Sequence, residues 1–184
     1  MKKVILFLVL LLTLSVVLGL AGCTPPLTYT VGDTGPAGGW IFYDKGISSD
    51  GWRYLEAAPD DQSIGSPWGC YGVSIWGADG TAVGTGEQNT IDIEAGCTTA
   101  GTAADICANL GLGGYSNWFL PSKDELNLMH TNLKDFGLGG FADYGYWSSS
   151  EVSANYAWIQ DFDSGYQLNY SKSYTFRVRA VRAF

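Results

Sequence analysis

The hydrophobic pattern of the first half of the chain predicts two short strands followed by a long loop. Residues 40–43 form an apolar run after two glycines, and residues 52–57 carry aromatic and aliphatic residues before Pro59. The Asp, Gly and Ser residues between the two runs are typical of turns. From residue 62 to residue 86 no helical or strand period is visible, so we expect a loop there.

Helix signals are confined to the middle of the chain. Residues 102–110 suit a helix that ends at the glycines following them. Ser122 and Glu125 have the spacing of a capping box, and apolar residues then recur on one helical face up to residue 134. A shorter helical turn is expected over residues 89–94.

The C-terminal part of the chain returns to strand patterns. We expect strands at residues 146–150, 156–162 and 166–170. Residues 177–184 alternate, which predicts one last strand with Val178 facing the core and the arginines facing solvent. Strands at both ends and two helices between them predict an α+β domain, in which the last strand pairs near the first.

The N-terminus has the pattern of a secretory signal. Two lysines precede an almost wholly apolar stretch over residues 4–18, and small residues lead to Cys23. This arrangement is similar to a bacterial lipobox, which implies cleavage after residue 22 and a lipid on Cys23. The alternative is an uncleaved anchor, although the apolar segment is at the short end of the spanning range.

The signal divides the chain into three parts. Residues 1–22 are expected to be removed, residues 23–30 to form a short tether, and residues 31–184 to fold as one domain. We therefore expect a lipid-anchored protein of the bacterial cell envelope, exposed on the outer membrane, with the membrane as one partner.

Composition excludes several classes of protein. After the signal the chain holds 8 basic and 18 acidic residues, so a nucleic-acid partner is not expected. Charged residues make up only 15% of the chain and aromatic residues 14%, which argues against disorder.

Three cysteines follow Cys23, and an exported protein can keep a disulfide. Cys97 and Cys107 flank a stretch rich in Gly, Thr and Ala that leads into a helix, so we expect these two to form the bridge. Cys70 would then be an unpaired, buried thiol. No zinc-ligand spacing is present.

Catalytic and metal-binding signals are weak. His130 is the only histidine, and its place on a helix predicts an exposed residue rather than a general base. Asp44, Asp50, Asp60 and Asp61 lie in turn regions without the spacing of a calcium loop, so we expect solvated side chains, no metal and no cofactor.

Five stretches, taken in order, carry a family resemblance. They are GPAGGWIFYDKG, DGWRYLEAAP, GYSNWFLPSKDEL, YGYWSSSE and FRVRAVRAF, and they run from about Val31 to Phe184. In these stretches the chain resembles the Lcl C-terminal-domain-like family of bacterial surface domains. The resemblance implies a C-type-lectin-like fold with two helices, small antiparallel sheets, long loops and termini close together.

Some members of that family resemble variable proteins of diversity-generating retroelements. In such systems reverse transcription mutates adenines, so asparagine codons can change to a restricted set of residues. Residues 147–184 suit this description. The side chains that then resemble a fixed scaffold are Trp147, Glu151, Trp158, Gln160, Gln167, Lys172, Arg177 and Arg179.

Between these positions lie residues that an asparagine codon can reach, rich in Tyr and Ser as antibody loops are. The ligand-binding residues predicted in this way are Val152, Ser153, Asn155, Tyr156, Ile159, Asp161, Asp163, Ser164, Tyr166, Leu168, Asn169, Tyr170, Ser173, Tyr174 and Phe176. The expected aromatic anchors are Tyr156, Tyr166, Tyr170 and Tyr174.

Charge is distributed in agreement with a recognition surface near the C-terminus. Residues 147–184 have a net charge of +1, whereas residues 23–146 have a net charge of −11. We expect a diversified binding protein for an unidentified protein or glycan ligand. Two alternatives remain: an adhesin of fixed specificity for glycans, and an enzyme of the formylglycine-generating type that uses Cys97 and Cys107.

Overall fold

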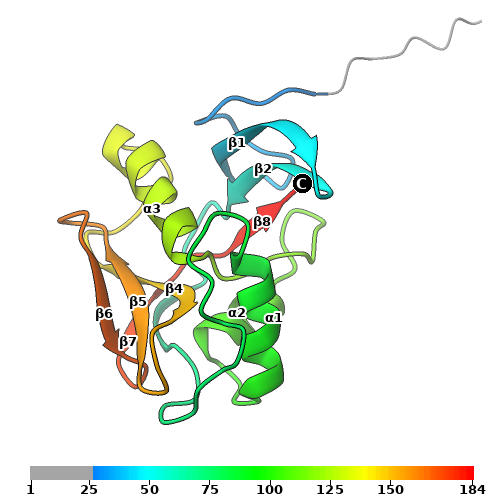
Figure 1. The fold of residues 1–184 in the computed structure, drawn as a ribbon. Helices are drawn as coiled ribbons and strands as arrows, with labels where there is room; N and C mark the ends of the chain where they lie inside the picture. The colour runs from blue at the N-terminus through cyan, green and yellow to red at the C-terminus, as the bar shows by residue number, and fades with distance from the viewer. Residues whose placement is uncertain (1–26) are drawn as a thin grey trace, which may run out of the picture.

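Two β-sheets and three α-helices form residues 27–184, the part of the chain that the computed structural model describes (Figure 1). The smaller sheet has the strand order β1-β2-β8, with bounds Trp40–Ser49, Trp52–Ala57 and Val181–Ala183. The larger sheet has the order β3-β7-β4-β5-β6, with bounds Ser63–Pro67, Thr175–Val178, Gly145–Glu151, Tyr156–Asp161 and Gln167–Ser171. The predicted α+β class is confirmed.

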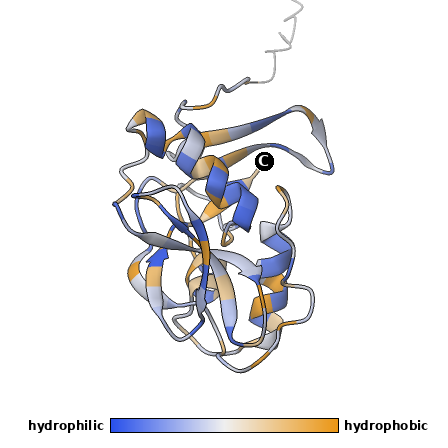
Figure 2. Ribbon diagram, turned by 60° about the vertical axis from the view of Figure 1, so that its left-hand side comes forward, coloured by the Kyte–Doolittle hydropathy of each residue, from blue (hydrophilic) through white to orange (hydrophobic). Residues whose placement is uncertain are grey.

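The helices lie between the early and late strands, as the sequence predicted, but there are three. They are α1 (Gly86–Gly96), α2 (Ala103–Ala108) and α3 (Lys123–Asn132), and a 3₁₀ turn at Lys134–Phe136 follows α3. Figure 2 shows hydrophilic and hydrophobic residues along the same helices, as expected for helices with one buried side. None of the helices in residues 27–184 is long and apolar enough to cross a membrane.

The start of α3 confirms the predicted capping box. The Ser122 hydroxyl accepts a hydrogen bond from the Glu125 N–H, and the Glu125 carboxylate accepts one from the Ser122 N–H at 2.7 Å. Leu126, Met129 and Leu133 are buried on the predicted face. Glu125 itself is fully buried and also accepts the Gly84 N–H, so it ties the loop before α1 to α3.

The prediction of a single last strand over residues 177–184, with its arginines in solvent, is wrong. The chain forms β7 in the larger sheet and then β8, which pairs with β2 in the smaller one. Arg179 and Arg182 are almost fully buried, although strand alternation placed them in solvent. The reason is that each guanidinium has a carboxylate partner from the first half of the chain, one fully buried and the other largely so.

Asp61 and Glu56 are these partners. Asp61 accepts hydrogen bonds from Arg179 Nε at 2.8 Å and from Arg177 Nη1 at 2.7 Å. Glu56 accepts one from Arg182 Nη1 at 2.9 Å and, through its other oxygen, the Gly39 N–H at 2.8 Å. The expectation that Asp61 is a solvated turn residue is therefore wrong.

The disulfide prediction also needs correction. Cys70 is bonded to Cys97, while Cys107 is free and buried in the core. The prediction rested on the short stretch of chain between Cys97 and Cys107. In the structure the end of α1 lies beside the loop that follows β3, and this places Cys70 next to Cys97. Burial raises the pKa of the Cys107 thiol far above its usual range.

Two smaller expectations change as well. Residues 63–67 of the expected loop form β3, which pairs with β7 and could not be recognised because its partner lies about a hundred residues later. His130 is buried instead of exposed, with its ring edge-on to Phe162 at 5.3 Å between centroids. Its Nδ1 lies 3.6 Å from the Asp135 carboxylate.

Replacing Asp61 should reveal the cost of a buried arginine without its partner. We expect Asp61→Asn to lower the free energy of unfolding by about 3–5 kcal/mol, because Arg179 stays buried with its charge uncompensated. Urea denaturation of this variant beside Asp60→Asn, an exposed neighbour, measures the difference. Equal effects of the two substitutions would contradict the role assigned to Asp61.

Glu125 predicts a pH dependence of stability. Burial raises the pKa of this carboxyl to about 7 from its ordinary value of 4.5, against the opposing hydrogen bonds from backbone N–H groups. The folded chain then binds the proton more tightly than the unfolded chain, so this group's contribution to stability decreases as pH rises from 4.5 to about 7. The unfolding free energy of the wild type should fall relative to Glu125→Gln, by at most about 1.4 kcal/mol per pH unit. A difference that does not change with pH would show that the backbone donors keep the carboxylate ionised.

Candidate ligand-binding face

Four aromatic rings form a continuous row on the larger sheet, which we call the aromatic row: Tyr144, Phe176, Tyr170 and Tyr174. Neighbouring ring centroids along the row are 6.4, 5.1 and 5.9 Å apart. The rings come from the residue before β4, from β7, from β6 and from the turn between β6 and β7. Tyr144 and Tyr174 are more than half exposed, so the row presents aromatic surface to solvent.

Phe176 connects the row to the core. Its ring meets the buried Trp147 edge-on at 4.9 Å between centroids, and the Trp147 indole N–H donates to the Ser66 carbonyl at 2.9 Å. β4 and β5 separate β7 from β6 in the sheet order, yet Phe176 reaches Tyr170, so the sheet curls beneath the row. The rings therefore rest on a buried, hydrogen-bonded support.

Gly145 makes room for the row. A Cβ at this position would lie 2.5 Å from Phe176 Cδ1 and 3.2 Å from Ile159 Cδ1. Any side chain at position 145 would displace the Phe176 ring. The glycine is thus required by close approach rather than by its backbone angles.

A shallow hollow of about 270 Å³ lies beside the row. Tyr144, Tyr170 and Phe176 line it, together with Ile159 and Leu168, which are paired across β5 and β6. The remaining lining residues are Gly145 and three carboxylates, Asp143, Asp161 and Asp163.

The predicted binding residues fall into several groups in the structure. Seven line the hollow or belong to the row: Ile159, Asp161, Asp163, Leu168, Tyr170, Tyr174 and Phe176. Others lie in the β4–β5 loop or at its end, namely Val152, Ser153, Asn155 and Tyr156. The turns on either side of β6 hold Ser164, Tyr166 and Ser173, and Asn169 lies on β6.

Strand alternation separates some of these residues. Tyr170 pairs with Ala157 and Leu168 with Ile159, which places these side chains on the face of the row. Tyr156 and Asn169 alternate with these residues and therefore lie on the opposite face of the sheet, together with Trp158. The Trp158 ring lies 4.7 Å from Lys123 Nζ of α3. Of the four tyrosines expected as anchors, the structure brings Tyr170 and Tyr174 together.

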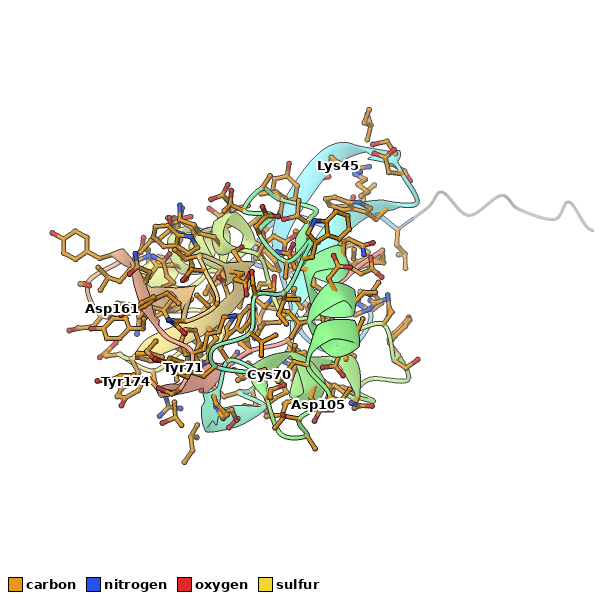
Figure 3. All side chains as sticks on the ribbon, turned by 60° about the horizontal axis from the view of Figure 1, so that its bottom comes forward. Lys45, Cys70, Tyr71, Asp105, Asp161 and Tyr174 are labelled. Atoms are coloured by element: carbon orange, nitrogen blue, oxygen red, sulfur yellow. A yellow bond between two sulfur atoms is a disulfide. The ribbon has the colours of Figure 1, made fainter. Side chains whose placement is uncertain are left out.

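Sequence reasoning missed residues that lie outside the C-terminal segment. Tyr144 and Gly145 precede residue 147, where the predicted region began, although the motif YGYW was visible. The loop over residues 70–77 was also missed, and its Trp76 is 95% exposed. Its Gly72 N–H donates to the Ala154 carbonyl at 2.9 Å, so the loop lies beside the β4–β5 loop. Figure 3 places Tyr71, Asp161 and Tyr174 on the same side of the molecule, away from Lys45.

A buried ion pair fixes this loop. Lys172 and Glu151 form the pair, and Lys172 Nζ also donates to the Val73 carbonyl at 2.8 Å. Glu151 accepts the Ile75 N–H at 2.9 Å. Burial lowers the pKa of Lys172, and the hydrogen bond to Glu151 opposes this shift. Both residues were expected to be scaffold, and both side chains are buried.

No basic side chain in residues 27–184 is without a carboxylate partner. All eight lysines and arginines there lie within 3.9 Å of a carboxylate oxygen. Seven of the eighteen carboxylates pair with a lysine or arginine and Asp135 lies beside His130, so ten have neither kind of neighbour among residues 27–184. In the same residues no group of three or more His, Cys, Asp or Glu side chains could hold a metal ion.

Comparison with known proteins identifies the domain. The family model of the Lcl C-terminal domain matches residues 72–182, which covers the helices, β4 to β7 and most of β8. A search of curated proteins finds no match. The fold described above, with three helices and two small sheets, is compatible with the C-type-lectin-like fold that the sequence resemblance implied.

Gly145→Ala should disturb the aromatic row directly. The added methyl group overlaps the Phe176 ring, so we expect the free energy of unfolding to fall by about 1–3 kcal/mol, as for other overpacked sites. Gly111→Ala is the matched control, since nothing lies within 4 Å of a Cβ there. Chemical denaturation of both variants measures the effect, and a Gly145 variant as stable as the control would show that Phe176 does not need this space.

Proposed function

Because the chain belongs to the Lcl C-terminal domain family, we propose that it is a cell-surface binding protein whose aromatic row contacts the ligand. The observation that carries this proposal is the row itself, in which three exposed tyrosines lie around the half-buried Phe176. Tyrosine offers a large apolar contact area and a hydroxyl for hydrogen bonding. A ligand that covers the row gains this area at reduced ordering cost, since Trp147 already holds Phe176, and Tyr144 and Tyr170 pack against Phe176.

Lipid anchoring on Cys23 is part of the proposal. The basic, apolar and small residues before Cys23 support it, although residues 1–26 lie outside the described part of the chain. Tyr29 packs against Phe184, which directly follows β8, with ring centroids 5.6 Å apart. In Figure 1 this end lies opposite to β6 and β7. An anchor attached here would direct the aromatic row away from the membrane.

We also propose that a diversity-generating retroelement varies the C-terminal segment. The distribution of exposure supports this: twelve of the fifteen predicted binding side chains are exposed, and only Ile159 is buried. Most of the expected scaffold side chains are buried instead, namely Trp147, Glu151, Gln160, Lys172 and Arg179. Variation at exposed positions on a buried scaffold changes the ligand without destabilising the fold.

A second candidate is an adhesin of fixed specificity for a neutral glycan. The exposed Trp76 favours it, because this indole lies beside a hollow of about 350 Å³ that Ser74, Asp79 and Glu151 also line. An apolar ring face with nearby polar groups suits a sugar. A polyanionic glycan has no such support, since the basic side chains of residues 27–184 are already paired.

Sequencing this gene in many cells of one population separates the two candidates. We expect the codons for Tyr156, Leu168, Tyr170 and Tyr174 to differ between cells at positions where the template has adenine, and the codons for Trp147 and Lys172 to be unchanged. A near-copy of the segment beside a reverse transcriptase gene would identify the template. Uniform codons and no template anywhere in the genome would contradict diversification and favour the fixed adhesin.

A further inference from the structure

We infer that the hollow beside the aromatic row receives a basic side chain, arginine or lysine, from a protein partner. This inference rests on the proposed function, in which the row is the binding surface. It adds the chemical class of the ligand, which neither the family nor the sequence specifies.

The walls of the hollow suit a cation with an apolar stem. Tyr144, Tyr170 and Phe176 present ring surface to it, and Ile159 and Leu168 add aliphatic surface. A cation over an aromatic ring is attracted by the ring quadrupole, and arginine binds most often in this way. The volume of about 270 Å³ is below the usual range for a whole small-molecule ligand but accommodates the end of one side chain.

The carboxylates of the hollow are available to such a cation. Asp161 and Asp163 have no cationic partner among residues 27–184, whereas Asp143 is paired with Lys134. Asp161 is held in place, because its oxygens accept the Asp163 N–H at 3.0 Å and the Ser164 hydroxyl at 2.8 Å. An arriving guanidinium would therefore meet an oriented carboxylate rather than a mobile one.

Two basic groups lie near the hollow, Lys134 and Arg177, and the charge of each is already compensated by a carboxylate. The Arg177 guanidinium carbon lies 5.8 Å from the centre of the Tyr144 ring while Nη1 donates to Asp61. Tyr144 thus already has a guanidinium near it within the fold. The charge of the hollow remains negative, which complements a basic partner and repels an anionic one.

The occupant is a protein rather than a free amine, because the row continues beyond the hollow. Tyr174 does not line the hollow, yet it is 59% exposed and its ring lies 5.9 Å from Tyr170. A free amine would leave this ring in water. A protein surface with a central basic residue and apolar neighbours would fill the hollow and cover Tyr174 together.

Nuclear magnetic resonance titration of the isotope-labelled full chain in detergent micelles tests the inference. The probes are N-acetyl-arginine amide, its neutral isostere N-acetyl-citrulline amide, N-acetyl-glutamate amide and a neutral monosaccharide. We expect the arginine probe alone to shift the amide signals of Ile159, Asp161, Leu168 and Tyr170. The shifts should weaken as salt is added.

Variants locate the interaction within the hollow. Asp161→Asn combined with Asp163→Asn, and separately Tyr170→Leu, should each weaken binding of the arginine probe at least fivefold. Asp60→Asn is the matched control, because Asp60 is an exposed carboxylate that lines neither this hollow nor the one beside Trp76. Unchanged melting temperatures show that the variants remain folded, and full binding by folded variants overturns the inference.

The outcomes distinguish this inference from the proposed function. Equal shifts from the citrulline probe, or shifts from the glutamate or sugar probe alone, would overturn the cationic ligand and leave the row as a binding face. No shift at these residues with any probe would count against both.

Discussion

The structure depends on two arginines near the C-terminus that are buried with carboxylates from the first half of the chain. Arg179 is held by Asp61, just before the larger sheet begins, and Arg182 by Glu56 of β2. Between them the chain leaves β7 and enters β8, and so passes from one sheet to the other. Buried charges at this crossing are tolerated because each is paired and hydrogen-bonded. The ion pairs set the register of the C-terminal strands relative to β2 and β3.

The position of the aromatic row follows from that register. β7 lies beside β4 through the pairing of Arg177 with Tyr146, and Tyr146 itself donates to Asp61 at 3.0 Å. This arrangement places Phe176 over Gly145 and against Trp147. The same carboxylate that compensates Arg177 and Arg179 thus also fixes the strand that carries Phe176. The hydrogen bonds of Asp61 thus connect the buried arginine to the strands that carry the aromatic row.

A second buried pair extends the face toward the loop over residues 70–77. Lys172 and Glu151 bind backbone groups of this loop, and the Cys70–Cys97 disulfide attaches its start to α1. Trp76 is therefore presented by a fixed loop rather than a mobile one. The exposed aromatic surface is made of two parts, one in the C-terminal segment and one in a loop about eighty residues earlier.

The sequence by itself determined the local features of this protein. The strand over residues 52–57 has the predicted bounds, and the capping box of Ser122 and Glu125 forms as predicted. Turn residues and helix caps act over a few neighbouring positions, so a local pattern is enough to predict them. The residue types of the C-terminal segment likewise indicated which side chains are exposed. Tertiary structure decided which distant residues meet: Cys70 with Cys97, Asp61 with Arg179, and Tyr144 with Phe176. Alternation predicted a single strand with Arg179 and Arg182 in solvent, whereas the chain forms two strands and buries both arginines. Whether a charge can be buried depends on a partner that no local pattern reveals.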